Sequence, residues 1–130
     1  MAEIDKENLR LYTHNFLEEF KALLGHRSYN LNKFHHKNKQ TILKLGFTEA
    51  QILDILYSLE IEDYCNGPIP DEYHPGDYWV FGKQVDCLEL YIKLKIVTKP
   101  SGDETAFCIS FHESEFPLRY PFSKAGDDKQ

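Results

Sequence analysis

Two neighbouring segments, residues 88–97 and 106–112, carry residue types that could act together on a phosphodiester. Both segments alternate apolar and polar side chains, the pattern of half-buried β-strands. Because successive side chains of a strand point to opposite faces, an antiparallel pair with its apolar faces together gathers its polar residues on one surface. That surface would hold Tyr91, Lys93, Lys95, Ser110 and His112. It would offer proton donors and acceptors beside fixed positive charge.

The apolar residues of the same two segments define the opposite face. In the first segment this set is Leu90, Ile92, Leu94 and Ile96, and in the second it is Phe107, Ile109 and Phe111. Apolar surface of this extent has to be buried. We therefore expect helices to cover that face and the polar face to stay accessible.

The first half of the chain supplies the helices that such a sheet needs. Apolar residues recur at helical spacing near the start, and Gly25 follows them as a candidate C-terminal cap. Residues 26–39 are basic and polar and predict a loop. Thr48 and Gln51 then fit a capping box that opens a further helix. From these patterns we predict helices at residues 5–24, 39–45 and 49–59.

The second half of the chain has the pattern of an antiparallel meander. Residues 66–76 hold three prolines and two glycines, which predicts a long loop that borders the polar face and is mobile without substrate. A strand is expected at residues 78–81. Turns are expected at residues 86–87 and 100–103. Helices first and strands after indicate one α+β domain over residues 1–122, with N-terminal helices packed on an antiparallel sheet. Residues 123–130 are expected to be a disordered tail.

Charge and cysteine content restrict the class of protein. A net charge of −6 argues against a broad nucleic-acid coat, although Lys93, Lys95 and Lys99 concentrate positive charge along one strand. No stretch approaches the ~20 continuous apolar residues of a membrane span, and the first residues lack a secretory segment. Three cysteines without metal-type spacing favour free thiols in a reducing compartment. We predict a cytoplasmic protein with no membrane partner, no metal and no cofactor.

Several short blocks of the chain form a combined motif when they are taken in order. They are Ser58-Leu59 to Asp63-Tyr64, the strand at Trp79, Leu90-Tyr91-Ile92-Lys93 and Ser110-Phe111-His112-Glu113. In order and spacing, across residues 35–122, these blocks resemble the MqsR family of toxin–antitoxin toxins. The resemblance implies a RelE-like fold, metal-independent cleavage of single-stranded messenger RNA, and neutralisation by a cognate antitoxin protein.

The resemblance extends to single positions, and the chain also departs from it. Tyr91 matches the family tyrosine of the central strand, and Lys93 follows two residues later. His112 stands where the best-known branch has a lysine after Ser-Phe. Asn66 stands where that branch has another lysine, and Val80 where it has a glutamine. Two active-site groups of that branch are therefore missing at the matched positions.

Tyr91, Lys93 and His112 would supply the parts that RNA cleavage without a metal requires. These are a base for the 2′-hydroxyl, an acid for the leaving 5′-oxygen, and positive charge on the transition state. His112 suits either proton role, Lys93 would stabilise developing charge, and Tyr91 would position the phosphate or donate a proton. The candidate substrate-binding residues are the cations Lys83, Lys95 and Arg119 and the base-stacking aromatic residues Tyr64, Tyr78 and Trp79.

Other interpretations of these residues remain open. A lysine row is also a common solvated strand face, and Trp79 also fits core packing. The missing groups favour a non-catalytic RNA- or protein-binding module on the same fold. A hydrolase using Cys108 with His112 is a third class, although no oxyanion-hole signature accompanies it. The adjacent His35 and His36 fit no standard zinc spacing.

Overall fold

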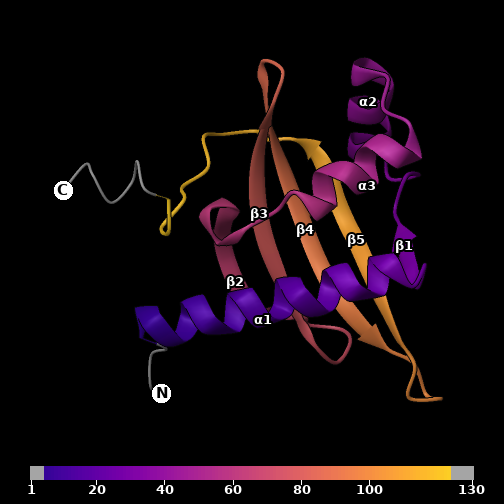
Figure 1. Ribbon diagram of the computed structural model, residues 1–130. Coiled ribbons are helices and arrows are strands. Elements are labelled where there is room, and N and C mark those ends of the chain that lie inside the picture. The colour runs from indigo at the N-terminus through magenta and orange to yellow at the C-terminus, as the bar shows by residue number, and fades with distance from the viewer. Residues whose placement is uncertain (1–4, 124–130) are drawn as a thin grey trace.

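The computed structural model describes residues 5–123, which form three α-helices and one five-stranded sheet (Figure 1). In chain order the elements are α1 (Lys6–Gly25), β1 (Tyr29–Leu31), α2 (His36–Leu45), α3 (Glu49–Tyr57), the 3₁₀ turn η1 (Ile61–Asp63), β2 (Tyr64–Pro70), β3 (Asp77–Val85), β4 (Leu88–Thr98) and β5 (Glu104–Glu113). The predicted α+β class is confirmed. Residues 124–130 of the predicted tail lie outside the described residues, as do residues 1–4.

The sheet has the strand order β1-β5-β4-β3-β2. The three pairs of consecutive strands, β2 with β3, β3 with β4 and β4 with β5, are antiparallel, as the meander pattern predicts. The short strand β1 was not predicted, because it lies in the basic segment 26–39 that we expected to be a loop. It pairs parallel with β5 and makes the sheet mixed. Three residues are too few to give a periodic signal, so only the pairing partner identifies this strand.

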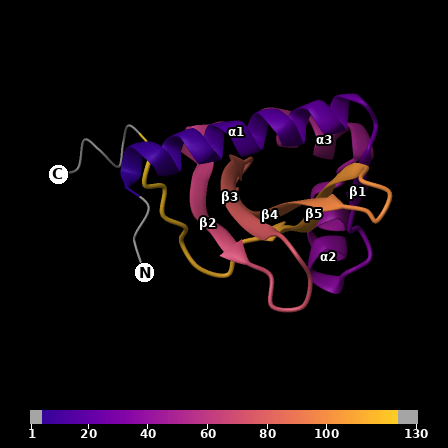
Figure 2. The same cartoon turned by 90° about the horizontal axis from the view of Figure 1, so that it is seen from below.

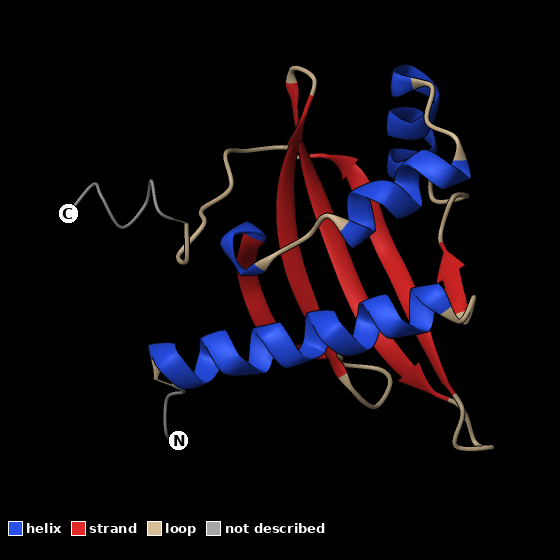
Figure 3. Cartoon of the chain, in the orientation of Figure 1, coloured by secondary structure: helices blue, strands red, loops and turns tan. Residues whose placement is uncertain are grey.

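Helices α1 and α3 cover one face of the sheet, with α1 crossing in front of the strands (Figure 3). Asp5 caps α1 by accepting a hydrogen bond from the Asn8 amide at 2.9 Å. The capping box of Thr48 and Gln51 opens α3, as predicted. The side chains buried between the helices and the sheet include Phe16, Phe20, Ile52, Leu56, Phe81, Ile92 and Leu94. Each such burial contributes roughly 1.5–3 kcal/mol, which fixes this face as the inside of the domain.

The C-terminal end of α1 differs in detail from the prediction. Gly25 is the last helical residue and not the left-handed cap residue, and His26 is the C-cap. The left-handed position falls on Arg27, whose φ is 60°. The chain therefore turns two residues later than a glycine cap would turn it.

The predicted loop 66–76 is half strand, which corrects the sequence interpretation. Tyr64–Pro70 forms β2 at the edge of the sheet and pairs with β3 through an irregular register. Proline is tolerated there because one side of an edge strand has no ladder hydrogen bonds to lose. The connecting loop is therefore shortened to residues 71–76. It borders the polar face, as predicted, since its side chains share a pocket with Tyr78 and Lys95.

The alternation along β5 is broken by a bulge, and this corrects the predicted apolar set. Lys93 pairs with Ser110 but the next residue of β4 pairs with Cys108, so Ile109 is the extra residue. Before the bulge, Ala106 and Cys108 face the core, and Phe107 lies on the opposite face beside Lys95. After the bulge, Phe111 returns to the core as predicted.

Helix α2 lies beside the outer edge of β5 (Figure 2). Two of its buried polar side chains, Asn38 and Thr41, take the place of a neighbouring strand. The Asn38 amide accepts from the Phe111 amide at 2.9 Å and donates to the Ile109 carbonyl at 3.0 Å. Thr41 Oγ1 accepts from the Glu113 amide at 2.9 Å. These bonds satisfy the β5 edge where β1 has ended, and they hold the strand that carries His112.

We predict that Asn38→Ala destabilises the domain by at least about 2 kcal/mol. The substitution leaves the buried Phe111 amide and the Ile109 carbonyl without partners, and each such group costs about 1–3 kcal/mol. Urea unfolding followed by circular dichroism measures the change. Lys39→Ala, an exposed substitution on the same helix, is the control. A midpoint for Asn38→Ala equal to that of the control would contradict the edge role.

The segment after β5 folds back as a strap, residues 116–122. It passes outside the sheet edge next to β2 (Figure 1). The Leu118 amide and the Tyr120 hydroxyl donate to the two carboxylate oxygens of Glu89, at 3.0 and 2.7 Å. Gly82 makes room for the strap, since a Cβ there would collide with Tyr120 and Leu118. Phe122 then reaches the core, where its ring lies 5.1 Å from Tyr64.

Candidate functional site

The face of the sheet opposite α1 and α3, here called the polar face, brings together the residues predicted to form the site. Across the strands Tyr91 pairs with Gly82 and with His112, and Lys93 pairs with Val80 and with Ser110. Directly paired residues of neighbouring strands project to the same side. Tyr91, Lys93, Ser110 and His112 therefore share one face, as the alternation predicts.

Tyr91 and His112 form a stacked pair on this face, near the C-terminal end of β5. Their ring centroids are 5.3 Å apart and the planes differ by 20°. His112 Nδ1 lies 2.9 Å from the backbone carbonyl oxygen of Glu113. A carbonyl only accepts, so this contact assigns the proton of neutral His112 to Nδ1 and leaves the lone pair on Nε2. The imidazole is thus held in one orientation with a basic nitrogen available.

The stacked pair lines a shallow pocket of about 240 Å³ together with residues from α2 and the segment after β5. Its lining residues are Lys37, Tyr91, His112, Ser114, Glu115 and Phe116. Lys37 Nζ lies 3.1 Å from the Glu115 carboxylate, so the charge of this lysine is balanced within the pocket. Sequence reasoning missed Lys37. The basic run at residues 33–39 was the available signal, but only the packing of α2 on β5 shows which of its cations reaches His112.

Burial keeps the titratable hydroxyl and thiol groups of this region protonated. It raises the pKa of the Tyr91 phenol, with a smaller contribution from Cys65. It also raises the pKa of the Cys65 thiol to about 12, assisted by the negative charges of Glu89 and Asp63. At neutral pH Tyr91 is therefore a hydrogen-bond donor, and Cys65 is not a thiolate nucleophile.

Lys93 is the available cation of the polar face. Its ammonium lies 4.3 Å from the centroid of the Tyr78 ring, in a cation–π arrangement. Within residues 5–123, no carboxylate lies at ion-pair distance from Lys93. An anion bound on this face would find a positive charge that is not already neutralised.

Lys95, predicted to bind substrate, is instead buried in an ion pair. Its ammonium lies 2.6 Å from the Asp71 carboxylate, and the two side chains are only 5% and 4% exposed. Asp71 also accepts from the Tyr78 hydroxyl and from the Tyr73 and His74 amides. Lys95 thus anchors the loop 71–76 to the sheet, and its charge is balanced by Asp71.

We predict that this anchor loosens in acid. The Lys95 hydrogen bond, followed by the Tyr73 amide, holds the pKa of Asp71 well below its usual range. A carboxyl with a depressed native pKa stabilises the fold above its unfolded pKa, near 3.9, and this contribution is lost as the pH falls toward the native pKa. The stability difference between wild type and Asp71→Asn should be largest above about pH 4 and shrink below it. Urea unfolding between pH 7 and pH 2.5 measures it, and a constant difference would contradict the prediction.

Three other candidate substrate-binding residues lie on the opposite face. Trp79 is buried against Phe16, with ring centroids 5.0 Å apart, and belongs to the core. Tyr64 is buried beside it. Lys83 Nζ contacts Asp63 at 3.1 Å on the helix side of the sheet. These residues do not line the pocket of Tyr91 and His112. Arg119 lies exposed in the strap.

The cysteine and metal alternatives receive no support from the geometry. Cys108 is fully buried in the core, on the face opposite His112, and burial raises the pKa of its thiol to about 12. All three cysteines are free. The described part of the chain contains no group of three His, Cys, Asp or Glu side chains placed to hold a metal ion. None of the helices within residues 5–123 is long and apolar enough to cross a membrane.

Comparison with known protein families gives one match. The sequence model of the family described as "Motility quorum-sensing regulator, toxin of MqsA" matches residues 12–113, which is most of the chain. The chain belongs to the MqsR toxin family. Membership identifies it as a toxin of a toxin–antitoxin system. A search of curated proteins returned no match, and neither did a search of solved structures.

Asn66 and Val80, two of the three positions that depart from the best-known branch of the MqsR family, lie in the same row as Lys93. Asn66 pairs with Val80, Val80 with Lys93, and Lys93 with Ser110. The substituted positions are thus neighbours of the Tyr91–His112 pair and not remote from it. In this member of the family, the row Asn66–Val80–Lys93 therefore contains an amide, an apolar side chain and one cation.

Proposed function

We propose that this toxin is a metal-independent endoribonuclease that cleaves single-stranded messenger RNA and is neutralised by a cognate antitoxin protein. The observation that carries the proposal is the stacked Tyr91–His112 pair, with the Nε2 lone pair of His112 available, on a face shared with Lys93. This set contains a proton-transfer group, a neutral donor and a fixed positive charge. Family membership supports the toxin role and the antitoxin partner.

In the proposed reaction the RNA supplies its own nucleophile. The 2′-hydroxyl oxygen attacks the adjacent phosphorus and loses its proton, while the bond to the 5′-oxygen breaks and that oxygen gains a proton. The products are a 2′,3′-cyclic phosphate and a free 5′-hydroxyl. His112 Nε2 carries the proton, Lys93 offsets charge on the phosphorane-like transition state, and the Tyr91 hydroxyl donates to a phosphate oxygen.

A non-catalytic RNA- or protein-binding module on the same fold is the second candidate function. It is favoured by Asn66 and Val80, because neither supplies the charge or the hydrogen bond that the best-known branch has at those positions. In this case Lys93 and the small pocket would bind a phosphate without cleaving its ester.

Purified protein incubated with single-stranded RNA in excess EDTA separates the two functions. We expect cleavage that persists in the chelator and yields fragments with 2′,3′-cyclic phosphate ends, identified by mass spectrometry. Uncleaved RNA that nevertheless co-migrates with the protein would support the binding module and overturn the enzyme. Cleavage abolished by EDTA and restored by Mg²⁺ would contradict metal independence.

A further inference from the structure

A large hollow lies on the polar face, next to Lys93 and away from the Tyr91–His112 pair. It has a volume of about 560 Å³ and is enclosed between the loop 71–76 and strands β4 and β5. This size falls in the usual range of small-ligand sites. Its walls include the Tyr78 ring and the apolar residues Phe107 and Ile109. The hollow and the candidate site therefore open on the same surface.

The apolar wall exists because of the β5 bulge. Without the bulge, Phe107 and Ile109 would belong to the core set, as the plain alternation predicts. The extra residue changes the phase and leaves Phe107 beside Lys95 on the polar face. Bulges are common next to functional sites because they re-aim side chains. An aromatic ring and a branched apolar side chain on a face otherwise lined by charged and hydroxyl groups form a surface on which a flat, weakly polar group can pack.

The opposite wall of the hollow, formed by the loop 71–76, is tied to the sheet through Asp71. Asp71 accepts from Lys95, Tyr78 and two amides of its own loop, and the Asp71 amide in turn donates to the Gly76 carbonyl at 3.1 Å. The close approach of the loop to Lys95 depends on Gly76, where a Cβ would lie 3.0 Å from the lysine side chain. A preformed site of this kind does not have to order its walls on binding.

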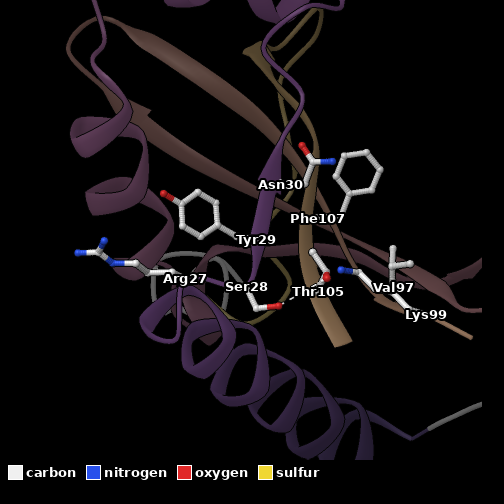
Figure 4. A pocket seen from close by; sticks show the side chains of 8 residues that line it. All are labelled: Arg27, Ser28, Tyr29, Asn30, Val97, Lys99, Thr105 and Phe107. Atoms are coloured by element: carbon white, nitrogen blue, oxygen red, sulfur yellow. Dashed lines mark hydrogen bonds between the residues drawn. The ribbon is translucent and has the colours of Figure 1, made fainter. Parts of the chain in front are cut away.

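Two cations lie beside residues that line the hollow, although neither lines it directly. Lys93 lies over the Tyr78 ring at the end nearest His112. At the far end, Phe107 and Val97 also line a second hollow of about 580 Å³, which contains Lys99. Figure 4 shows Lys99, Val97, Thr105 and Phe107 on one side of β1, with the Lys99 ammonium directed toward Thr105. Tyr29 and Arg27 lie on the other side of β1 (Figure 4).

The arrangement of charge, aromatic ring and charge suits a bound segment of single-stranded nucleic acid. Lys93 and Lys99 are six residues apart, so they are separated by about 20 Å along the chain, the length of a few nucleotides. Single-stranded nucleic acid binds where aromatic side chains stack on bases and cations follow the backbone. An apolar peptide segment would fill the same hollow, but it carries no negative charge that could pair with Lys93 and Lys99.

We infer that the hollow is a nucleotide subsite, in which one base of single-stranded RNA packs against Phe107 and Tyr78 while Lys99 binds a phosphate a few nucleotides further along the strand. This inference rests on the proposed ribonuclease function, since it assigns the neighbouring phosphate, at Lys93, as the scissile one. Phe107 and Tyr78 are then the residues that decide which base stands next to the cleaved bond.

The test measures binding apart from cleavage. A fluorescent single-stranded RNA with 2′-O-methyl groups cannot form the cyclic phosphate, so its anisotropy reports affinity alone. We expect Phe107→Leu, which keeps apolar volume but removes the ring, to weaken binding at least about fivefold. Lys99→Gln should weaken binding and reduce the salt slope by about 0.7, the value for one phosphate contact on a single strand. Lys21→Gln removes the same charge on α1, which covers the opposite face of the sheet (Figure 3), and should leave the affinity unchanged.

Cleavage of natural RNA by the same four proteins supplies the second readout. Sequencing of the product ends should show a changed base preference beside the cut for Phe107→Leu and an unchanged preference for Lys21→Gln. Differential binding without any cleavage would contradict the proposed enzyme and still support the subsite. Equal affinity and equal base preference in all four proteins would overturn the subsite. A loss of antitoxin affinity in Phe107→Leu with unchanged RNA binding would overturn it as well, in favour of a protein contact.

Discussion

His112→Ala is expected to lower the rate of RNA cleavage by about 10²–10⁴-fold while RNA affinity changes little. General acid–base catalysis by a positioned group is typically worth that factor, and His112 is oriented by the Glu113 carbonyl with Nε2 available. Removal of a proton-transfer group lowers the rate of the chemical step more than it lowers binding. Single-turnover cleavage of a defined single-stranded RNA measures the rate, and anisotropy with the uncleavable analogue measures the affinity.

The control for this substitution is His14→Ala. His14 is an exposed histidine on α1, on the opposite side of the molecule from the polar face, so its removal should leave the rate unchanged. Cells that express His112→Ala should continue to grow, whereas wild type and His14→Ala should arrest growth. Full cleavage activity in His112→Ala, or growth arrest equal to that of wild type, would show that another group transfers the proton.

Lys93→Ala is expected to impair both RNA binding and RNA cleavage. The cleavage rate should fall by about 10²–10³-fold, and the affinity for RNA should be weaker. One well-placed donor to the transition-state charge is typically worth that factor in rate. The same ammonium also contacts the phosphate of the bound substrate, so its removal reduces affinity in proportion to the electrostatic share of binding. The remaining affinity should therefore depend less on salt than that of wild type.

Lys39→Ala provides the matched control for this second substitution. Lys39 is exposed on α2 and does not line the pocket of His112, so it alters net charge by the same amount without touching the site. Both proteins should unfold at the wild-type urea concentration, because within residues 5–123 Lys93 makes no ion pair and its ammonium packs on the Tyr78 ring. An unchanged salt slope in Lys93→Ala would show that the lysine does not bind phosphate.

The sequence was sufficient wherever the deciding physics is local. Side chains alternate along a strand, so Tyr91 and Lys93 had to share a face. The capping box of Thr48 and Gln51 spans only four residues, so it could be recognised from the sequence. Helices before strands indicated the α+β class. The ordered blocks around Tyr91 and His112 indicated the family that the comparison then gave.

The tertiary structure decided everything that depends on which partner lies across the sheet or the core. A single extra residue at Ile109 moved Phe107 from the expected core to the polar face, and no local pattern announces a bulge. Lys95 was indistinguishable from Lys93 by alternation. It is buried because Asp71, 24 residues earlier, folds over it, while the Lys93 ammonium lies over the ring of Tyr78 with no carboxylate at ion-pair distance within residues 5–123. Period-two alternation specifies faces, but the burial of a charge depends on contacts between residues distant in sequence, and those exist only once the chain has folded.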